Sequence, residues 1–501
     1  MRPSMKTFHL FTAGALILAI VSSCNKDLDV VQRDKLTASN MWQNSAQVEA
    51  ATNAIYADIR ANFVQDNISL LHWGELRVGP YLWGYSRVNK IYTSKEVLEN
   101  TMTSSSASCR WTRLYAAIDA ANAVIKHAPQ VNMPDEKLSW ALGQAYFARA
   151  YCYFWAARLW GDVPLNLKPV ESPSQSETYP VRAPKEEVYA QIGSDIRSAV
   201  AHADALGNNK YLATRDAANM LKAEYALWMY STQNGGEEWL AQAEEALDSI
   251  GTEEGDKRLL TDYADVFDGR GGGNKNSEEV IFALQNNQTY QLTGGYPIYF
   301  TFASSAVKAE WQNSPVPVRS TQYLDYGDQF LAMMRKSRDE NGDTRVQTNL
   351  GEGPYGVSGN TLTWPNKFIG SLTTGTMIPD ADLIYYRYAL ALMLRAETRY
   401  YENKYDEALK YLNIIAKRAY KKDNYYTAAT RSAVLQALID EYFLEFPAEG
   451  VIWWALIRLD RIWDYNDDLK KRKGDTNILL WPIHKDARNK NSKLTQTEGW
   501  Y

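Results

Sequence analysis

Apolar positions recur every three to four residues along much of the chain, which is the spacing of one face of an α-helix. The first such stretch begins with Asn44 and Gln47, a pair that resembles a capping box. It continues with a stripe at Ala51, Ile55 and Ile59. This pattern predicts a helix that starts at Asn44 and buries one face.

The same spacing predicts a series of further helices. Residues 134–160 carry a stripe of small side chains, which lets a neighbouring helix approach closely, and Gly161 followed by Pro164 ends that segment. Pro184 opens the next segment, with Glu186 and Glu187 in its first turn, where acidic side chains favour the helix dipole. Apolar stripes also occupy residues 214–230, 239–250 and 383–416. The pattern therefore predicts repeated helix pairs.

Two long stretches lack helical periodicity. Residues 64–107 and 251–379 are rich in Gly, Asn, Ser, Thr and aromatic side chains, and the second stretch includes Gly271-Gly272-Gly273 and Gly294-Gly295. Loops of this length in a compact protein are usually functional. We therefore interpret the helices as a scaffold and these two stretches as the working surface.

The N-terminus has the pattern of an export signal. Arg2 and Lys6 precede an apolar run of twelve residues, 10–21, which is too short to span a membrane. Ser22-Ser23-Cys24 follows and resembles a bacterial lipobox, in which the cysteine becomes the lipidated N-terminus. Residues 1–23 are thus predicted to be a lipoprotein signal peptide and Cys24 the lipidation site. The alternative is an ordinary signal peptide with a chance cysteine.

Composition narrows the range of functions. The formal net charge is −5, so no basic field points to nucleic acid. Beyond Cys24 only Cys109 and Cys152 remain, which is too few for a disulfide framework. The chain holds 16 Trp and 33 Tyr, and aromatic side chains in this number can line a sugar- or peptide-binding surface as well as a core.

Motifs for catalysis, metals and cofactors are weak. The five histidines show no metal-ligand spacing, so no metal site is predicted. Gly351-Glu-Gly-Pro-Tyr-Gly356 matches a dinucleotide-binding pattern only formally, because Pro354 interrupts it and no βαβ unit surrounds it. No serine has the surroundings of a nucleophile elbow. We therefore expect neither an enzyme nor a bound cofactor.

Several motifs, in order, resemble the SusD/RagB family of nutrient-binding outer-membrane lipoproteins. The resemblance covers nearly the whole mature chain. It rests on Leu159-Trp-Gly-Asp-Val-Pro-Leu165, Thr214–Leu221, Arg387–Glu397, Glu441 with Glu445–Gly450 and Trp453, Leu480–Ile483 and Leu494–Gln496. The chain departs from the family at Ile452 and Ala455, beside that Trp, and at Asp343-Thr344-Arg345, where the family usually has Asp-Pro-Arg. Both places are interpreted as structural.

The resemblance implies a mainly α fold. It predicts a scaffold of four tetratricopeptide-like helix pairs and an irregular, loop-rich lobe with short strands. The expected regions are a signal peptide (1–23), a lipidated tether and anchoring segment (24–43), an N-terminal helical region with a binding loop at 64–107 (44–250), an irregular binding lobe (251–379) and a C-terminal helical region (380–501).

The resemblance also implies the function and the partner. The expected protein is anchored by lipid in the outer membrane, exposed at the cell surface, and non-catalytic. It would capture oligosaccharides and act as a lid on a SusC-like, TonB-dependent barrel. A peptide-capturing, RagB-like lid is the main alternative, and a secreted helical glycoside hydrolase is a further one.

Two aromatic loop segments are the predicted ligand-binding sites, because their rings belong to no helical stripe and lie beside glycine turns. The first segment offers Arg77, Tyr81, Trp83, Tyr85 and Asn89. The second offers Asn287, Tyr290, Tyr296, Tyr299 and, just beyond it, Trp311. Trp83 and Tyr296 are the leading candidates, each following a turn. Sugar C–H faces stack on such rings, while the hydroxyl groups need fixed polar partners.

Overall fold

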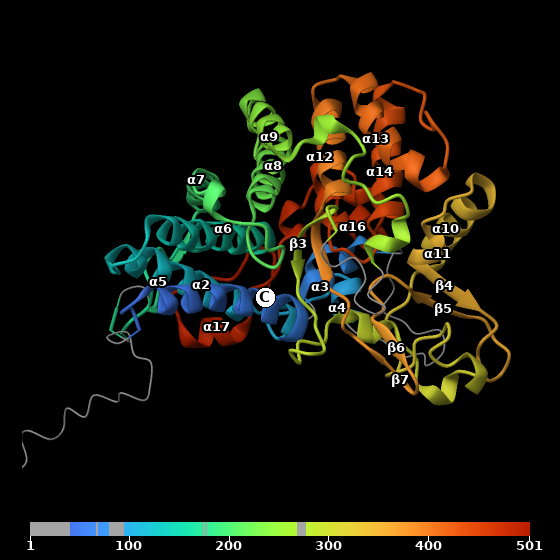
Figure 1. The fold of residues 1–501 in the computed structure, drawn as a ribbon, viewed down its shortest axis with the longest axis horizontal. Coiled ribbons are helices and arrows are strands. Elements are labelled where there is room, and N and C mark those ends of the chain that lie inside the picture. Colours follow the sequence, from blue (N-terminus) through green and yellow to red (C-terminus); the bar gives the residue numbers. More distant parts are fainter. Residues whose placement is uncertain are drawn as a thin grey trace, which may run out of the picture. The chain divides into compact units, whose positions relative to one another are not determined.

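The computed structural model describes residues 41–66, 69–79, 95–172, 174–175, 178–267 and 277–500 (Figure 1). By their internal contacts, residues 44–501 group into one unit. The predicted lipidation site Cys24 and most of the loop that follows Gly79 lie outside the described residues. In the part of the chain that the structure describes, no helix combines the length and apolarity needed to cross a bilayer.

Helices dominate the first half of this unit. Asn44 caps the first of them, because its side-chain oxygen accepts a hydrogen bond from the Gln47 backbone N–H at 3.1 Å, as the sequence pattern predicts. The helices are α2 (Ser45–Arg60), α3 (Ser69–Gly74), α4 (Lys95–Leu98), α5 (Thr112–His127), α6 (Asp135–Trp160), α7 (Lys185–Ala201), α8 (Arg215–Thr232) and α9 (Glu237–Ile250).

Helix pairing continues through the second half. Helix α2 packs on α5, α6 on α7, α8 on α9, and α12 on α13. The C-terminal helices are α12 (Tyr388–Tyr401), α13 (Tyr405–Tyr420), α14 (Arg431–Glu445), α15 (Ile452–Arg458), α16 (Asp467–Lys471) and α17 (Lys485–Lys490). The predicted mainly α fold with helix pairs is confirmed.

The predicted irregular lobe holds short antiparallel strands and, among its helices, a 14-residue helix that the apolar pattern did not predict. That helix, α10 (Asp328–Asn341), buries Phe330, Leu331 and Met334, a stripe too short to stand out among its charged neighbours. The short helix α11 (Val346–Asn349) follows it. Within the lobe, β4 (Leu350–Gly353) pairs with β5 (Leu362–Pro365), and β6 (Ser371–Thr373) pairs with β7 (Thr376–Ile378). Strand β3 (Val280–Leu284) of the lobe pairs with β8 (Leu383–Arg387) of the C-terminal region, whereas β1 (Val163–Pro164) and β2 (Arg182–Ala183) pair in the N-terminal region.

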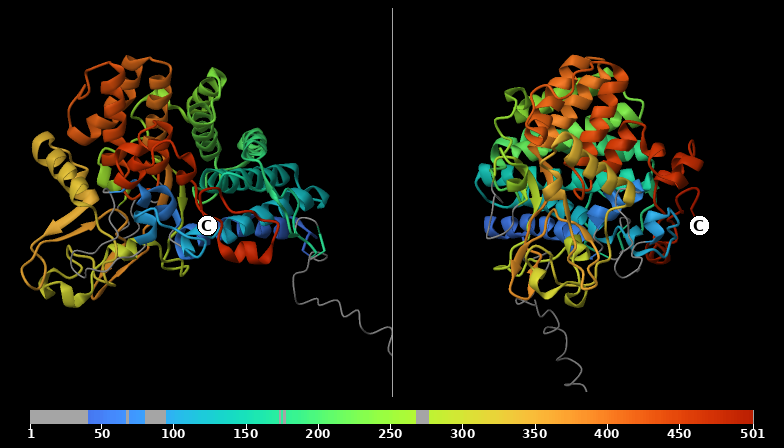
Figure 2. Two further views of the ribbon diagram at one scale, coloured as in Figure 1. Left: turned by 180° about the vertical axis from the view of Figure 1, so that it is seen from behind. Right: turned by 90° about the vertical axis from the view of Figure 1, so that its right-hand side faces the viewer.

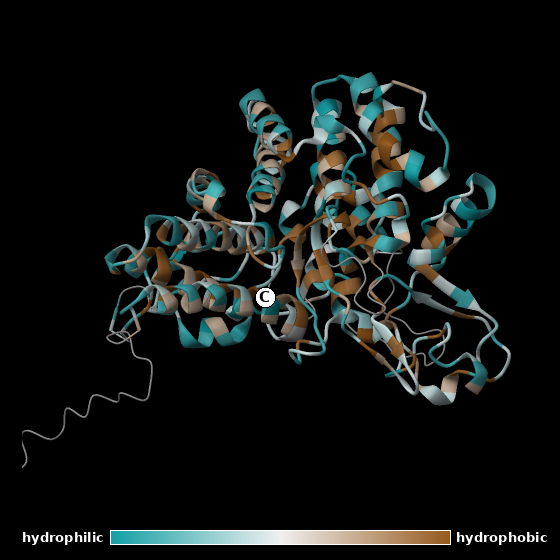
Figure 3. Ribbon diagram, in the orientation of Figure 1, coloured by the Kyte–Doolittle hydropathy of each residue, from teal (hydrophilic) through white to brown (hydrophobic). Residues whose placement is uncertain are grey.

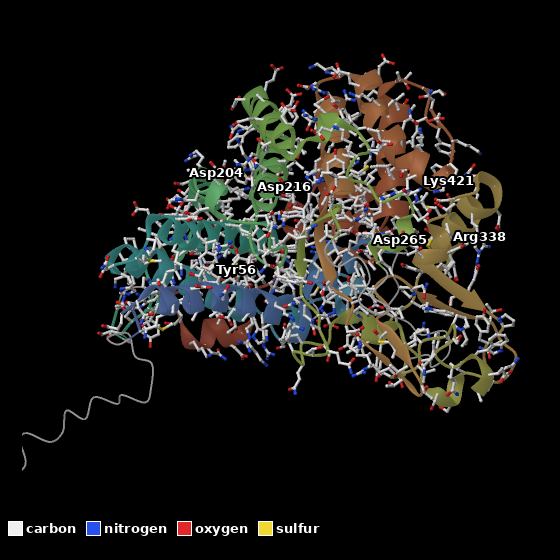
Figure 4. The ribbon with its side chains drawn as sticks, in the orientation of Figure 1. Tyr56, Asp204, Asp216, Asp265, Arg338 and Lys421 are labelled. Carbon is white, nitrogen blue, oxygen red and sulfur yellow. The ribbon has the colours of Figure 1, made fainter. Side chains whose placement is uncertain are left out.

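Apolar residues gather where the helices meet the strands, whereas the outer faces of the helices are hydrophilic (Figure 3). Polar contacts also bind elements together inside this core. Tyr56 of α2, labelled in Figure 4, donates its hydroxyl to the Gln144 side chain of α6 and accepts the Ala213 backbone N–H at 3.1 Å. The residue that precedes the N-cap of α8 is thereby tied to α2 and α6.

A buried ionic cluster holds the lobe to the C-terminal helices. Although burial opposes ionisation, the nearby Arg418, Arg387 and Arg345 hold the pKa of Glu445 well below its usual range. Arg345 also contacts Glu441 at 2.5 Å. The cluster consists of Asp343, Arg345, Lys367, Arg387, Arg418, Glu279, Glu441, Glu445 and Glu449, all of them buried.

At one of the two departures from the family motifs the residue that differs is Thr344, which donates both its backbone N–H and its hydroxyl to the Ala419 carbonyl at 3.0 Å. The two residues that flank it belong to the ionic cluster. Asp343 and Arg345 pair with each other inside it, Arg345 Nε donating to Asp343 Oδ1 at 2.9 Å. At the other departure, Ile452 and Ala455 are fully buried in α15. The interpretation of both places as structural is confirmed.

Candidate functional site

A ladder of aromatic rings runs from the core of the irregular lobe to its surface. Buried Phe302 meets buried Trp364 edge-on, with ring centroids 6.0 Å apart. Trp364 lies 6.2 Å from Tyr355, and Tyr355 lies 5.3 Å from Trp311 with the two ring planes inclined at 53°. Trp311 is 39% exposed. The outermost two rings therefore form an aromatic surface supported from below.

Two glycines on β4 make room for this ladder. A Cβ atom on Gly351 would lie 2.0 Å from the Trp364 ring, and one on Gly353 would lie 2.2 Å from the Tyr355 ring. Gly351 pairs with Trp364 across the β4–β5 ladder. Since any larger residue would displace the rings, the Gly-x-Gly-Pro-Tyr segment serves as a seat for aromatic side chains.

The backbone around Trp311 is fixed by hydrogen bonds. Its carbonyl accepts the N–H groups of Ser314 and Val316, and its own N–H donates to the Lys308 carbonyl at 3.0 Å. Lys308 N–H in turn donates to the Tyr355 carbonyl at 2.9 Å. The two loops that carry the exposed rings are thus joined directly, and the pair is organised before any ligand arrives.

Polar groups surround the pair. Lys308 is partly exposed, and Glu310 and Asn360 are exposed, so they can offer hydrogen bonds to a ligand. A Cβ atom on Gly356 would lie 2.1 Å from the Asn360 side-chain oxygen, which places this amide against the Tyr355 loop. These groups supply donors and acceptors beside the rings.

The carboxylate of Glu352, which lies between Gly351 and Gly353 and so points to the opposite face of β4 from the rings, is engaged in ion pairs. It pairs with Arg335 at 2.7 Å and with Arg338 at 2.6 Å, the latter labelled on α10 in Figure 4. Burial raises the pKa of this carboxyl, but hydrogen bonds from the two arginines outweigh that effect and lower it. Glu352 therefore stays ionised at neutral pH.

Asn287 and Tyr290 lie apart from this ladder in sequence, in the hairpin that follows β3. The Asn287 side chain accepts the Thr289 backbone N–H at 2.8 Å, and Asn287 pairs with Leu292 across the hairpin. Tyr290 stands at the tip and is 66% exposed. Its ring is available to a ligand, whereas the Asn287 side chain shapes the turn.

Tyr299 is partly exposed and forms a second pair with Tyr323. The ring centroids lie 5.6 Å apart with planes at 85°. The Tyr299 carbonyl accepts the backbone N–H groups of Tyr323 and Leu324. Because its ring stays partly exposed, Tyr299 remains a predicted ligand contact.

Tyr296 is a correction to the predicted site. Its side chain is 0% exposed, and its hydroxyl donates to the Ala448 carbonyl. Its ring packs edge-on against Phe300 and Phe368. The turn at Gly294-Gly295 directs the ring into the core rather than into solvent, so Tyr296 does not reach a ligand in this structure.

Arg77 is the second correction, because it is buried in the core. It donates to the Asn100 side chain at 2.8 Å and to the Leu479 carbonyl at 2.9 Å. Its guanidinium lies 4.6 Å from the Trp453 ring centroid. Burial lowers the pKa of Arg77 to about 9. Arg77 therefore joins the N-terminal region to the C-terminal segment.

Tyr81, Trp83, Tyr85 and Asn89 lie outside the described residues, so they remain predicted contacts. Tyr355 is not among the residues that the sequence pattern predicts. The available signal was the pair of alternate glycines, Gly351 and Gly353, opposite a tryptophan on a second short strand. Across the residues described, no group of three or more His, Cys, Asp or Glu side chains is placed to hold a metal ion.

Family profiles match both halves of the chain. The SusD family profile matches residues 322–500. A second profile, described as "Starch-binding associating with outer membrane", matches residues 82–226. Together they cover helices α4 to α7 and most of α8, part of the irregular lobe, and the C-terminal region as far as residue 500.

Relatives and solved structures extend the match over the full length. SusD-like protein P38 of Formosa agariphila is 23% identical over 98% of this chain and 99% of its own. A SusD-like protein of Bacteroides ovatus is 27% identical over 57% of this chain and 50% of its own. A SusD superfamily structure from Bacteroides fragilis superposes with a TM-score of 0.77 at 24% identity, covering 92% of this chain and 100% of that one. A laminarin-binding SusD-like protein gives 0.71 at 17% identity, with coverage of 92% and 100%.

The fold and site thus define a helix-pair scaffold that carries an irregular lobe with an exposed aromatic pair. The chain belongs to the SusD/RagB family.

Proposed function

We propose that the protein is a non-catalytic, lipid-anchored cell-surface lipoprotein that captures glycans and passes them to a SusC-like, TonB-dependent barrel. The proposal places lipidation at Cys24 and the glycan on the exposed aromatic pair of the lobe. Family membership and the structural likeness to a laminarin-binding protein support it.

The pairing of Trp311 with Tyr355 is the observation that carries the proposal. The two rings are inclined at 53°, so they form a bent surface rather than a flat one. Sugar rings present C–H faces that pack on aromatic rings, and their hydroxyl groups bind polar side chains at the edge. Lys308 is partly exposed and Glu310 and Asn360 are exposed in the loops that carry the two rings, so they can supply such bonds.

A glycan panel with matched variants tests the site. At millimolar affinity the total binding free energy is only about −4 kcal/mol, so losing a contact worth roughly 1.5–3 kcal/mol removes most measurable binding. Trp311→Ala and Tyr355→Ala should abolish retention of the bound glycan, whereas Trp311→Phe and Tyr355→Phe keep a ring and should retain part of it. Equal affinity in all four variants would place the site elsewhere. Trp83→Ala in the same panel tests the first predicted loop.

The partner is tested separately. Affinity purification from detergent-solubilised membranes should recover one large, β-rich outer-membrane protein together with this chain. If the native barrel is expressed but is not recovered under mild conditions, the lid role fails, whether or not glycans bind.

The two alternative functions, peptide capture and glycoside hydrolysis, are tested with the same purified protein. A peptide panel run beside the glycans tests the RagB-like alternative, in which peptides would replace glycans on the same rings. A retaining or inverting hydrolase needs a carboxylic acid with a raised pKa beside the bond it cleaves. Glu352 of β4, whose pKa is lowered, does not have this property. Release of reducing ends from any bound glycan would establish catalysis and refute the non-catalytic role.

A further inference from the structure

The excursion between β1 and β2 presents apolar side chains to solvent. Leu167 and Val170 follow β1 and are 41% and 39% exposed. Tyr179 and Val181 precede β2 and are 48% and 61% exposed. These four residues, named the apolar patch here, are the majority of the large hydrophobic side chains exposed in the described part of the chain. Clustered exposed apolar side chains mark interaction surfaces.

The outgoing arm of this excursion is held to α5 by polar contacts. Tyr115 donates to the Pro164 carbonyl at 2.7 Å, and Asn122 donates to the Asn166 carbonyl at 2.9 Å. Asp119 accepts the Val170 backbone N–H at 2.8 Å. Because the backbone is bound by side chains of α5, the apolar side chains of the arm are left outward.

The returning arm is fixed in the same way by the C-terminal segment. Asn491 donates to the Pro180 carbonyl at 2.6 Å. Arg182 donates to the Gln496 carbonyl at 3.0 Å and to the Trp160 carbonyl at 3.0 Å. The apolar patch is therefore displayed on an arm held at both ends, and the segment around α17 lies directly beside it.

That neighbouring segment is basic. Residues 485–493 contain four cations and one acid, Asp486, which lies 3.4 Å from the guanidinium of exposed Arg110. Helix α17 is predominantly hydrophilic in Figure 3. The cations, named the basic strip here, are all exposed: Arg110, Lys485, Arg488, Lys490 and Lys493.

We propose that the apolar patch and the basic strip together dock on an anionic membrane surface. Peripheral membrane attachment has two components. Apolar side chains enter the headgroup boundary, and cations bind the lipid phosphates. Protein interfaces are depleted of Lys, whereas three of the five cations in the basic strip are Lys, so a lipid surface fits this composition better than a protein surface. The docking rests on the proposed lipid anchoring, which keeps the membrane within reach and lets a weak contact act.

Flotation of the unlipidated mature chain, residues 25–501, with lipid vesicles tests the docking. The chain should float with vesicles of phosphatidylcholine and phosphatidylglycerol, float poorly with phosphatidylcholine alone, and lose binding at high salt. Each removed cation near the surface lowers partitioning about fivefold, so Lys490→Ser/Lys493→Ser should lower it about 25-fold. Lys336→Ser/Lys422→Ser, on and beside α10, makes the same charge change elsewhere and should leave binding unchanged.

The apolar component is tested independently. Tyr179→Ser/Val181→Ser should lower vesicle binding about tenfold at constant charge. All the altered side chains are exposed, so the melting temperature verifies that each variant is folded. The docking is overturned if wild type, the basic-strip variant Lys490→Ser/Lys493→Ser and the apolar-patch variant Tyr179→Ser/Val181→Ser all bind vesicles equally. If these variants instead lose barrel recovery while vesicle binding persists, the surface belongs to a protein partner and the lipid assignment is wrong. Glycan retention is unaffected in either case, so failure here is distinct from failure of the aromatic site.

Discussion

Arg387 and Glu445 meet inside the protein, Nη1 lying 2.6 Å from Oε1 with both side chains fully buried. The same Glu445 carboxylate contacts Arg418 at 2.5 Å and Arg345 at 3.1 Å. One acidic side chain on α14 therefore contacts three cations from other parts of the chain, and Asp343, Glu279, Glu441 and Glu449 supply the remaining negative charge of the balance. The lobe, β8 and two C-terminal helices depend on that balance.

Glu445→Gln should destabilise the fold strongly. The amide keeps the shape but removes one charge, and breaking a buried ion pair from one side costs about 3–5 kcal/mol. Denaturant unfolding measures the loss. Glu340→Gln on α10, whose exposed partner Lys336 lies 4.0 Å away, is the control and should leave the free energy of unfolding almost unchanged. Similar results for both variants would contradict the role assigned to the ionic cluster.

Tyr296 variants should affect stability and not glycan binding. Tyr296→Phe removes the bond to the Ala448 carbonyl, which is worth about 0.5–1.5 kcal/mol. Tyr296→Ala empties a buried aromatic position and should cost about 3–5 kcal/mol. Thermal unfolding and glycan retention are measured on the same samples. A folded Tyr296→Phe that binds no glycan would restore this residue to the binding site.

Alanine at the two glycines of β4 should separate stability from binding. Gly353→Ala displaces the partly exposed Tyr355 ring, so it should weaken glycan retention while the melting temperature falls little. Gly351→Ala presses on the buried Trp364 ring and should cost roughly 1–3 kcal/mol of stability. Ser358→Ala, at an exposed position in the same loop, serves as the control. Full binding by Gly353→Ala would mean that Tyr355 is not a contact.

Glu75 gives the stability a pH dependence. Burial raises the pKa of its carboxyl to about 7, against the lowering effect of bonds from the Ala448 and Gly450 N–H groups. Between pH 4.5 and 7 the folded state holds a proton that the unfolded state releases. The contribution of Glu75 to the free energy of unfolding is therefore fully present below its unfolded pKa. It is lost as the pH rises through 7, and the total loss is about 3 kcal/mol. The free-energy difference between wild type and Glu75→Gln, measured from pH 4 to 8, should show this fall, and a flat difference would refute it.

Cys24→Ala should release the protein from membrane fractions. In the proposed function, Cys24 carries the several acyl chains of a bacterial lipoprotein, which would hold firmly at about 0.8 kcal/mol per buried CH₂, and the substitution removes their attachment point. Fractionation and immunoblotting measure the release. Continued attachment at high salt would show that another element anchors the chain. Protease added to intact cells then reports whether the anchored protein faces outward.

Regular apolar spacing made the scaffold predictable, because a helix that buries one face must repeat its apolar residues every three to four positions. The cap at Asn44 and the small-residue face of α6 follow directly from such patterns. Helix α10 did not, because its buried stripe of Phe330, Leu331 and Met334 occupies little more than one turn.

The site was less predictable because an aromatic ring beside a turn can point either way. Tyr296 and Trp311 both lie in the loop-rich lobe and both have polar neighbours, yet one is buried and the other is exposed. What separates them is packing from distant parts of the chain. The Ala448 carbonyl receives the Tyr296 hydroxyl, whereas Tyr355 supports Trp311 from one side only.

Arg77 bonds to the Leu479 carbonyl across 402 residues of sequence, and the Trp481 N–H donates to the Leu159 carbonyl. Figure 2 shows the C-terminal segments in red beside the N-terminal helices in blue from both directions. Contacts of such long range close late, and they slow folding. The N-terminal helices therefore cannot complete their core until the last residues have been synthesised. A chain built in this way leaves the ribosome incompletely folded, and its N-terminal helices wait with part of their core open for the C-terminal segment to close it.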